Sequence, residues 1–167
     1  NFQKDSNGKQ AKVPTNATWH TDHTNKELPP KFTILHALAI PSKGGGTSVV
    51  NMGAAYDALS AERQAELADL QTANQRISSA RLAFANLDTL AEQERLAEPL
   101  MVHPLVRTHP DKGTKAIWFH QGKTETITGM DAFETQDFLK ELLEETIKEE
   151  FAYTHNWTLG DMLIVDN

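Results

Sequence analysis

The sequence has 167 residues, 39% of them hydrophobic, which is enough for one globular domain with a buried core. Its 23 acidic and 16 basic residues give a net charge of −7, which argues against nucleic acid or an anionic membrane as a partner, because both select basic faces. The absence of cysteine excludes disulfides and thiolate metal sites, and no apolar run approaches the roughly 20 residues that cross a bilayer, so we expect a soluble protein and a cytoplasmic location.

The first stretch that carries chemistry is Trp19-His20-Thr21-Asp22, which follows a polar arm over residues 1–18. Residues two apart in an extended strand point the same way, so His20 and Asp22 are expected to reach one metal ion together. An imidazole and a carboxylate are two of the three ligands in the facial triad of non-haem Fe(II) oxygenases. The spacing alone is a weak signal, because a surface turn or a hydrogen-bonded His–Asp pair produces it as well.

A strand is predicted over residues 31–40, after Pro29-Pro30, with apolar side chains on both faces, which indicates burial in a barrel or sandwich. His36 lies on its bulkier face and is interpreted as a core histidine bonded to backbone. Glycines at 44–46 favour a tight turn, and residues 47–51 resume as a strand. A phosphate loop is not expected there, because the lysine precedes the glycines and a strand follows.

Residues 53–98 are rich in Ala, Leu, Glu, Arg and Gln, which favours a helical insertion that either covers a binding site or packs outside the barrel. Ser60 is the expected N-cap of one helix, with Glu62 in its first turn, and a second helix is expected over 90–97. An outer helix is expected over 132–151, because apolar residues recur there at helical spacing.

Strand signals return over 100–108, with a break at His103-Pro104, and over 115–119 after a turn at Asp111-Lys112-Gly113, which together predict an antiparallel hairpin. Residues 124–128 add a short strand and 162–165 a buried one. Hairpins without alternating β-α units favour a mainly β fold, a sandwich or jelly roll with added helices. We expect one domain over 1–167, incomplete at both ends, since the sequence starts without methionine and stops just after an apolar strand.

Four separated regions resemble one family, the Fe(II)/2-oxoglutarate-dependent dioxygenases of the taurine dioxygenase and 2,4-dichlorophenoxyacetate dioxygenase (TauD/TfdA) type. They cover residues 19–24 (Trp-His-Thr-Asp-His-Thr), 44–47 (Gly-Gly-Gly-Thr) with 51–59, 103–110 (His-Pro-Leu-Val-Arg-Thr-His-Pro) and 157–167. Four matches in the family's order and rough spacing are more specific than any one. The resemblance implies a double-stranded β-helix, the cupin-like jelly roll.

The resemblance also implies the site. His20 and Asp22 would bind Fe(2+), and Thr47 would hydrogen-bond the distal carboxylate of the cosubstrate 2-oxoglutarate. With O2, such a protein oxidises a small organic acid and releases succinate and CO2. A second iron-binding histidine and a cosubstrate-binding arginine are expected beyond Asn167.

The remaining histidines are not expected to supply the third ligand. His103, His109, His120 and His155 lie in stretches that match other family segments, and His23 would point to the face opposite Asp22 if the strand continued. Two other interpretations stay open: a non-catalytic jelly-roll binding module, and a family member that kept the fold and lost catalysis. Substrate identity and a homo-oligomeric state are also left open.

Overall fold

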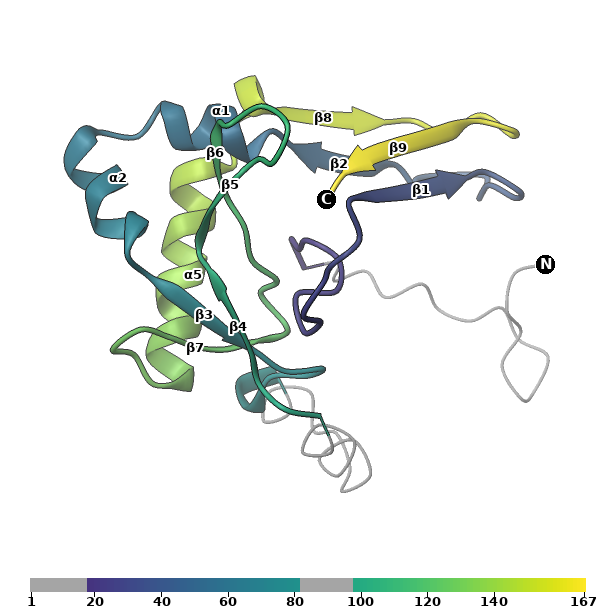
Figure 1. The fold of residues 1–167 in the computed structure, drawn as a ribbon. Coiled ribbons are helices and arrows are strands. Elements are labelled where there is room, and N and C mark those ends of the chain that lie inside the picture. The colour runs from purple at the N-terminus through teal and green to yellow at the C-terminus, as the bar shows by residue number, and fades with distance from the viewer. Residues whose placement is uncertain (1–17, 82–97) are drawn as a thin grey trace.

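The structure is a computed structural model and describes residues 18–81 and 98–167. In this part of the chain the strands are short and pair antiparallel, and helices gather at one end (Figure 1). The elements in chain order are β1 (Phe32–His36), β2 (Thr47–Val50), α1 (Met52–Asp57), α2 (Ala61–Ala68), β3 (Gln71–Asn74), β4 (Met101–Pro104), β5 (Val106–Thr108), β6 (Lys115–Ile117), β7 (Thr124–Ile127), α5 (Ala132–Thr146), a 3-10 turn η1 (Glu149–Phe151), β8 (Ala152–His155) and β9 (Met162–Asp166).

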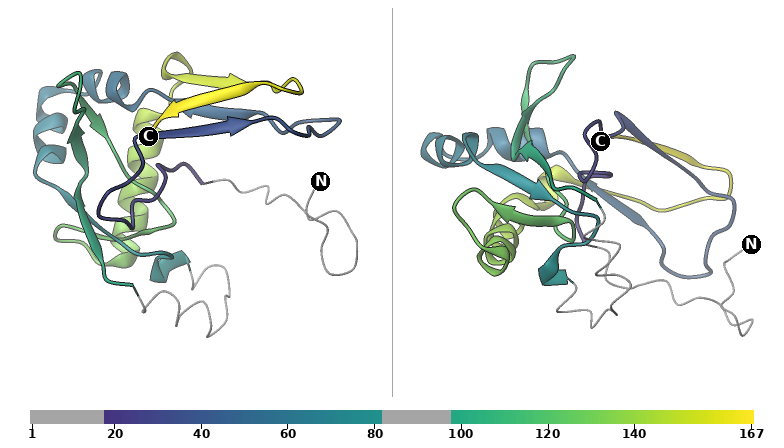
Figure 2. Two further views of the ribbon diagram at one scale, coloured as in Figure 1. Left: turned by 45° about the vertical axis from the view of Figure 1, so that its right-hand side comes forward. Right: turned by 60° about the horizontal axis from the view of Figure 1, so that its bottom comes forward.

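Strands that are distant in sequence pair with one another. β1 pairs with β9 and β2 with β8, so the last described strands return to the first ones. β3 lies between β4 and β7, and β5 and β6 form the predicted hairpin. The β1–β9 and β2–β8 ribbons extend to the same side of the molecule, away from α2 and α5 (Figures 1 and 2).

The hydrophobic core lies between the helices and the strands β5, β6 and β7. Its fully buried members are Leu67, Leu105, Ile127, Leu139 and Leu142. Leu139 and Leu142 are three residues apart on α5 and therefore share the face of the helix that packs inward. Within residues 18–81 and 98–167, no helix combines the length and the apolar character needed to cross a membrane.

Helix α5 begins with a capping box. The Asp131 carboxylate accepts hydrogen bonds from the backbone N–H groups of Phe133 and Glu134, and the Glu134 side chain accepts one from the Asp131 N–H. The helix ends at Thr146 rather than at residue 151 as expected. Ile147 is extended, with ψ 91°, and the β-branched pair Thr146-Ile147 disfavours a further helical turn.

The helical insertion expected over 53–98 is only partly helical. Ser60 caps α2 by accepting from the Arg63 N–H, with Glu62 in the first turn, as predicted. The chain then forms β3, where Thr72 and Asn74 are fully buried. A strand that buries polar side chains lacks apolar alternation, so the hydrophobic pattern could not reveal it. The helix predicted at 90–97 lies outside the described residues.

The prediction that the strands around β1 and β9 are buried is wrong for the described residues. Ile34 and Ile164 face each other across the ribbon and are 58% and 60% exposed. His36 is exposed as well, so the prediction of a core histidine is also wrong. A two-stranded ribbon buries a face only when a second layer packs on it, and none of the described elements covers this face.

Candidate metal centre

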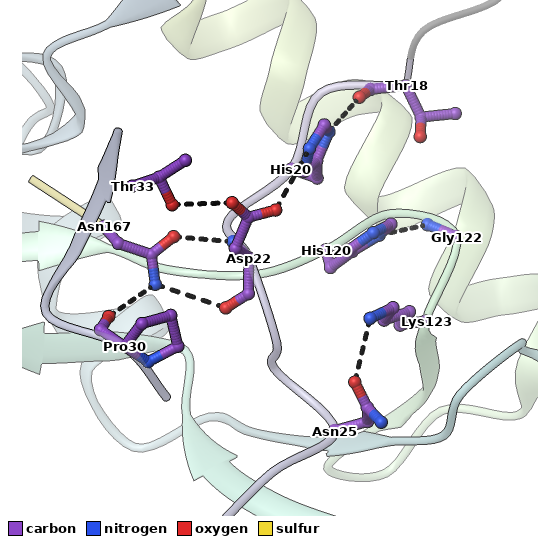
Figure 3. Close-up of polar contacts among 10 residues, drawn as sticks. All are labelled: Thr18, His20, Asp22, Asn25, Pro30, Thr33, His120, Gly122, Lys123 and Asn167. Atoms are coloured by element: carbon purple, nitrogen blue, oxygen red, sulfur yellow. Dashed lines mark hydrogen bonds and ion pairs between the residues drawn. The ribbon is translucent and has the colours of Figure 1, made fainter. Parts of the chain in front are cut away.

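His20 and Asp22 lie together although they do not share a continuous strand. His20 forms an isolated antiparallel bridge with His120, and Asp22 already belongs to the turn that follows. The side chains face each other, with 3.5 Å between His20 Nε2 and Asp22 Oδ1 (Figure 3). His23 has a φ of 57° and is exposed, so the strand does not continue through it. The pair therefore meets because the chain turns, not because a strand alternates.

The hydrogen bonding of His20 prepares it to bind a cation. Its Nδ1 lies 2.7 Å from the backbone oxygen of Thr18. A carbonyl oxygen only accepts, so Nδ1 carries a proton, and in the neutral form of the ring the free lone pair is on Nε2. That lone pair then faces the Asp22 carboxylate oxygen, and two acceptors at this distance are stabilised by a cation between them.

The spacing of the two candidate ligand atoms fits a divalent first-row ion. Bonds of about 2.1 Å to each atom, at ligand–metal–ligand angles of about 90° to 110°, place the atoms roughly 3.0 to 3.4 Å apart. The observed separation of 3.5 Å is close to this range. Imidazole nitrogen and carboxylate oxygen are also the donor types that non-haem iron sites use.

Asp22 is held by groups from both ends of the described chain. The hydroxyl of Thr33 on β1 donates to Asp22 Oδ2 at 2.6 Å. Asn167, just after β9, accepts from the Asp22 N–H at 2.7 Å through its Oδ1. Its Nδ2 donates to the backbone oxygens of Asp22, at 3.2 Å, and Pro30, at 2.9 Å (Figure 3). The sequence pattern did not single out Thr33, and it placed Asn167 only within a matching stretch.

His120 packs against His20 with a ring-centroid distance of 4.9 Å. It is 8% exposed, and its Nδ1 accepts from the Gly122 N–H at 3.1 Å. Burial lowers the pKa of His120 to about 3, with smaller contributions from the nearby His20 and Lys123 side chains. The ring is therefore neutral near pH 7 and adds no positive charge beside a cation. Sequence reasoning missed this neighbour because it lies 100 residues from His20.

A third ligand is not supplied by the described part of the chain. Within residues 18–81 and 98–167, no three His, Asp or Glu side chains cluster closely enough to hold a metal ion. The other histidines that were not expected to be ligands have partners elsewhere: His103 with the backbone oxygen of Lys26, His109 with Asp166, and His155 with Asp161.

Thr47 begins β2 and is half-buried. Its Oγ1 accepts a hydrogen bond of 2.9 Å from Nε1 of Trp157, whose ring packs edge-on against His155 at a centroid distance of 4.5 Å. An indole N–H only donates, so the proton of the Thr47 hydroxyl stays available for another acceptor. A carboxylate is such an acceptor. The 110 residues between Thr47 and Trp157 hide this contact from the sequence pattern.

Comparison with known proteins places these features in a family. The model described as "Taurine catabolism dioxygenase TauD, TfdA family" matches residues 1–167. The alpha-ketoglutarate-dependent 2,4-dichlorophenoxyacetate dioxygenase of Cupriavidus pinatubonensis is 35% identical over 152 residues, which are 91% of this chain and 52% of that protein. The (S)-phenoxypropionate/alpha-ketoglutarate-dioxygenase of Sphingobium herbicidovorans is 29% identical over 156 residues, with 91% and 54% covered.

Solved structures agree with this assignment. The crystal structure of AAD-2 in complex with Mn(II) and N-oxalylglycine matches with a TM-score of 0.76 at 32% identity, over 89% of this chain and 57% of that one. A taurine dioxygenase from Burkholderia xenovorans matches with a TM-score of 0.68 at 27% identity, over 89% and 48%. The likeness supports a mainly β fold with helices. This chain spans about half the length of the curated relatives it matches. Since the family model matches the chain from end to end, the chain belongs to the TauD/TfdA dioxygenase family.

Proposed function

We propose that the whole protein containing this chain is an Fe(II)- and 2-oxoglutarate-dependent dioxygenase that oxidises a small organic acid. The observation that carries the proposal is the pair of His20 Nε2 and Asp22 Oδ1, which face each other while the His20 proton stays on Nδ1. Such a pair supplies two ligands of the facial triad of non-haem iron oxygenases. Family membership and relatives named for phenoxy acids support the reaction and the substrate class.

The protein and the bound groups have separate tasks in this reaction. When bound, Fe(II) and 2-oxoglutarate supply the oxidising chemistry, in which the two atoms of O2 go to succinate and to the oxidised substrate as CO2 leaves. His20 and Asp22 donate two ligand atoms, and the uncharged ring of His120 packs beside them. Thr47, whose hydroxyl proton is left free by the Trp157 N–H, donates to the distal carboxylate of 2-oxoglutarate.

We also propose that residues 1–167 belong to one domain with the double-stranded β-helix of a jelly roll. The antiparallel return of β9 to β1 and of β8 to β2 supports this topology. The exposed apolar face of the β1–β9 ribbon, with Ile34 and Ile164, supports a further layer over it. In this proposal the third iron ligand and the cosubstrate-binding arginine come from the part of the protein that follows Asn167. A cytoplasmic location fits the lack of cysteine.

The proposal is tested on the whole protein by two measurements. Mn(II) binding is followed by electron paramagnetic resonance, and succinate formation is followed with Fe(II), 2-oxoglutarate and a panel of phenoxy acids and small sulfonates. We expect His20→Ala to lose both, while His36→Ala, at an exposed histidine on β1, behaves as the wild type. Unchanged Mn(II) affinity in His20→Ala would overturn the ligand assignment. A wild type that neither binds Mn(II) nor forms succinate would instead be a non-catalytic jelly-roll module.

A further inference from the structure

The two oxygens of the Asp22 carboxylate have different surroundings. Oδ1 faces His20 Nε2 at 3.5 Å, whereas Oδ2 accepts the Thr33 hydroxyl at 2.6 Å. A hydrogen bond of this length to a carboxylate is charge-assisted and stronger than a neutral one. One oxygen is therefore engaged by the protein, and the other is left on the side of the histidine (Figure 3).

Thr33 is well placed to hold that oxygen. It is the second residue of β1, opposite Val165 of β9, so its backbone is held by the strand pair. Its neighbours Phe32 and Ile34 point to the exposed face, and strand alternation directs Thr33 to the other face. A β-branched side chain also has restricted χ1 rotation. The hydroxyl is thus presented to Asp22 with little freedom to turn away.

Asn167 fixes the backbone of the same ligand. Its amide accepts once and donates twice, and all three partners are backbone groups: the N–H and oxygen of Asp22 and the oxygen of Pro30. Its own backbone N–H donates to the oxygen of Lys31 at 2.9 Å. Asn167 therefore ties the two ends of the turn from Asp22 to Pro30 to the end of β9. An aspartate would lack the two donated bonds.

We propose that Thr33 and Asn167 are positioning residues for the Asp22 carboxylate, with Asn167 holding its backbone and Thr33 occupying Oδ2 so that Oδ1 alone is offered to the metal ion. This inference rests on the proposed function, since it gives a geometry to the ligand assigned there. Hydrogen-bond partners of metal ligands typically change metal affinity by about 10- to 100-fold when they are removed.

The test compares three substitutions by Mn(II) titration of the whole protein. Thr33→Val keeps the shape and branching but removes the hydroxyl, and we expect a roughly 10- to 100-fold loss of Mn(II) affinity. Thr33→Ser keeps the hydroxyl and should stay close to the wild type. Thr154→Val is the matched control, because it removes an exposed hydroxyl that bonds Ser48 across the β2–β8 ribbon, and it should leave the affinity unchanged. Thermal unfolding in EDTA reports stability separately.

The outcomes separate this inference from the proposed function. Wild-type affinity in Thr33→Val overturns the inference, and so does an equal loss in Thr33→Val and Thr33→Ser, which would assign the effect to packing. If Thr33→Val does not fold, Thr33→Cys replaces it under the same criterion, since a thiol is a weak donor. Should His20→Ala lose Mn(II) binding while Thr33→Val keeps it, only the positioning role fails. Should His20→Ala bind Mn(II) normally, the proposed function itself fails.

Asn167 has its own pair of substitutions. Asn167→Ala removes all three side-chain bonds, and Asn167→Asp keeps the acceptor for the Asp22 N–H while losing both donations. We expect both to weaken Mn(II) binding by about tenfold or more. Unchanged affinity in Asn167→Ala would overturn the role of Asn167.

The cobalt(II) absorption spectrum gives a second readout for Thr33→Val. If Asp22 binds the metal through two carboxylate oxygens instead of one in this variant, the coordination number of the cobalt ion changes and so does its spectrum.

Discussion

Asn74 is fully buried in β3, and its side-chain amide joins that strand to both of its neighbours. Its Nδ2 donates to the Thr72 hydroxyl at 2.9 Å and to the backbone oxygen of Met101 on β4 at 3.2 Å. Its Oδ1 accepts from the Thr124 hydroxyl on β7 at 3.1 Å. The backbone N–H of Thr124 donates to the backbone oxygen of His120 at 2.9 Å, so this polar network reaches the residue that packs on His20.

We expect Asn74→Ala to lower the free energy of unfolding by about 3 kcal/mol. Each of the three bonds contributes about 1 kcal/mol net, and a partner left buried without a bond costs roughly 1 to 3 kcal/mol, partly offset by relaxation of the hydroxyls. Met101 on β4 and Thr124 on β7 are the partners that lose most when the Asn74 side-chain amide is removed. The loosened β7 should also lower Mn(II) affinity modestly through His120, whereas direct loss of a ligand abolishes binding.

Urea unfolding followed by tryptophan fluorescence measures the effect. The change in unfolding free energy is the change in the urea midpoint multiplied by the denaturant slope that the two proteins share. Gln71→Ala on the same strand is the matched control, because Gln71 is exposed, and its cost should stay within about 0.5 kcal/mol. A loss below about 1 kcal/mol in Asn74→Ala would refute the reasoning, since three buried bonds cannot then be holding the sheet together.

Two further predictions concern polar contacts at the edges of the fold. Asp131→Ala removes the capping box of α5 and should lower the free energy of unfolding by about 1 kcal/mol, measured in urea. Asp137→Ala, at an exposed site inside the helix, should lower it by less. Equal effects of the two substitutions would show that the capping box does not stabilise the helix. Hydrogen bonds from Lys26 and then Asn25 lower the pKa of Glu98. A carboxyl group whose pKa is lower in the folded than in the unfolded protein stabilises the fold at pH values above the unfolded pKa of 4.5. This contribution is lost as the pH falls through the pKa of the folded protein. Glu98→Gln should therefore unfold at lower urea than the wild type at pH 7, and the difference should vanish in acid; a difference that persists there would contradict the assignment.

Features that depend on neighbouring residues could be predicted from the sequence. The Ser60 cap, the β5–β6 hairpin and the turn at Gly113, where φ is 70°, each depend on residues a few positions apart, and the structure contains them. The proximity of His20 and Asp22 belongs to the same class. Short spacing limits how far apart two side chains can lie, so the pair meets in the turn even though the predicted strand is absent.

The surroundings of the candidate site depend on the tertiary structure. Thr33, His120 and Asn167 gain their importance from contacts with His20 and Asp22, and two of these contacts join residues 100 or more positions apart. The polar interior of β3 and the exposed β1–β9 face likewise follow from which strands pair and which layers cover them. By itself the sequence determined the two candidate ligand types, their spacing and the family pattern. The tertiary structure alone decided which carboxylate oxygen faces His20, because that depends on hydrogen bonds from strands brought together by long-range pairing.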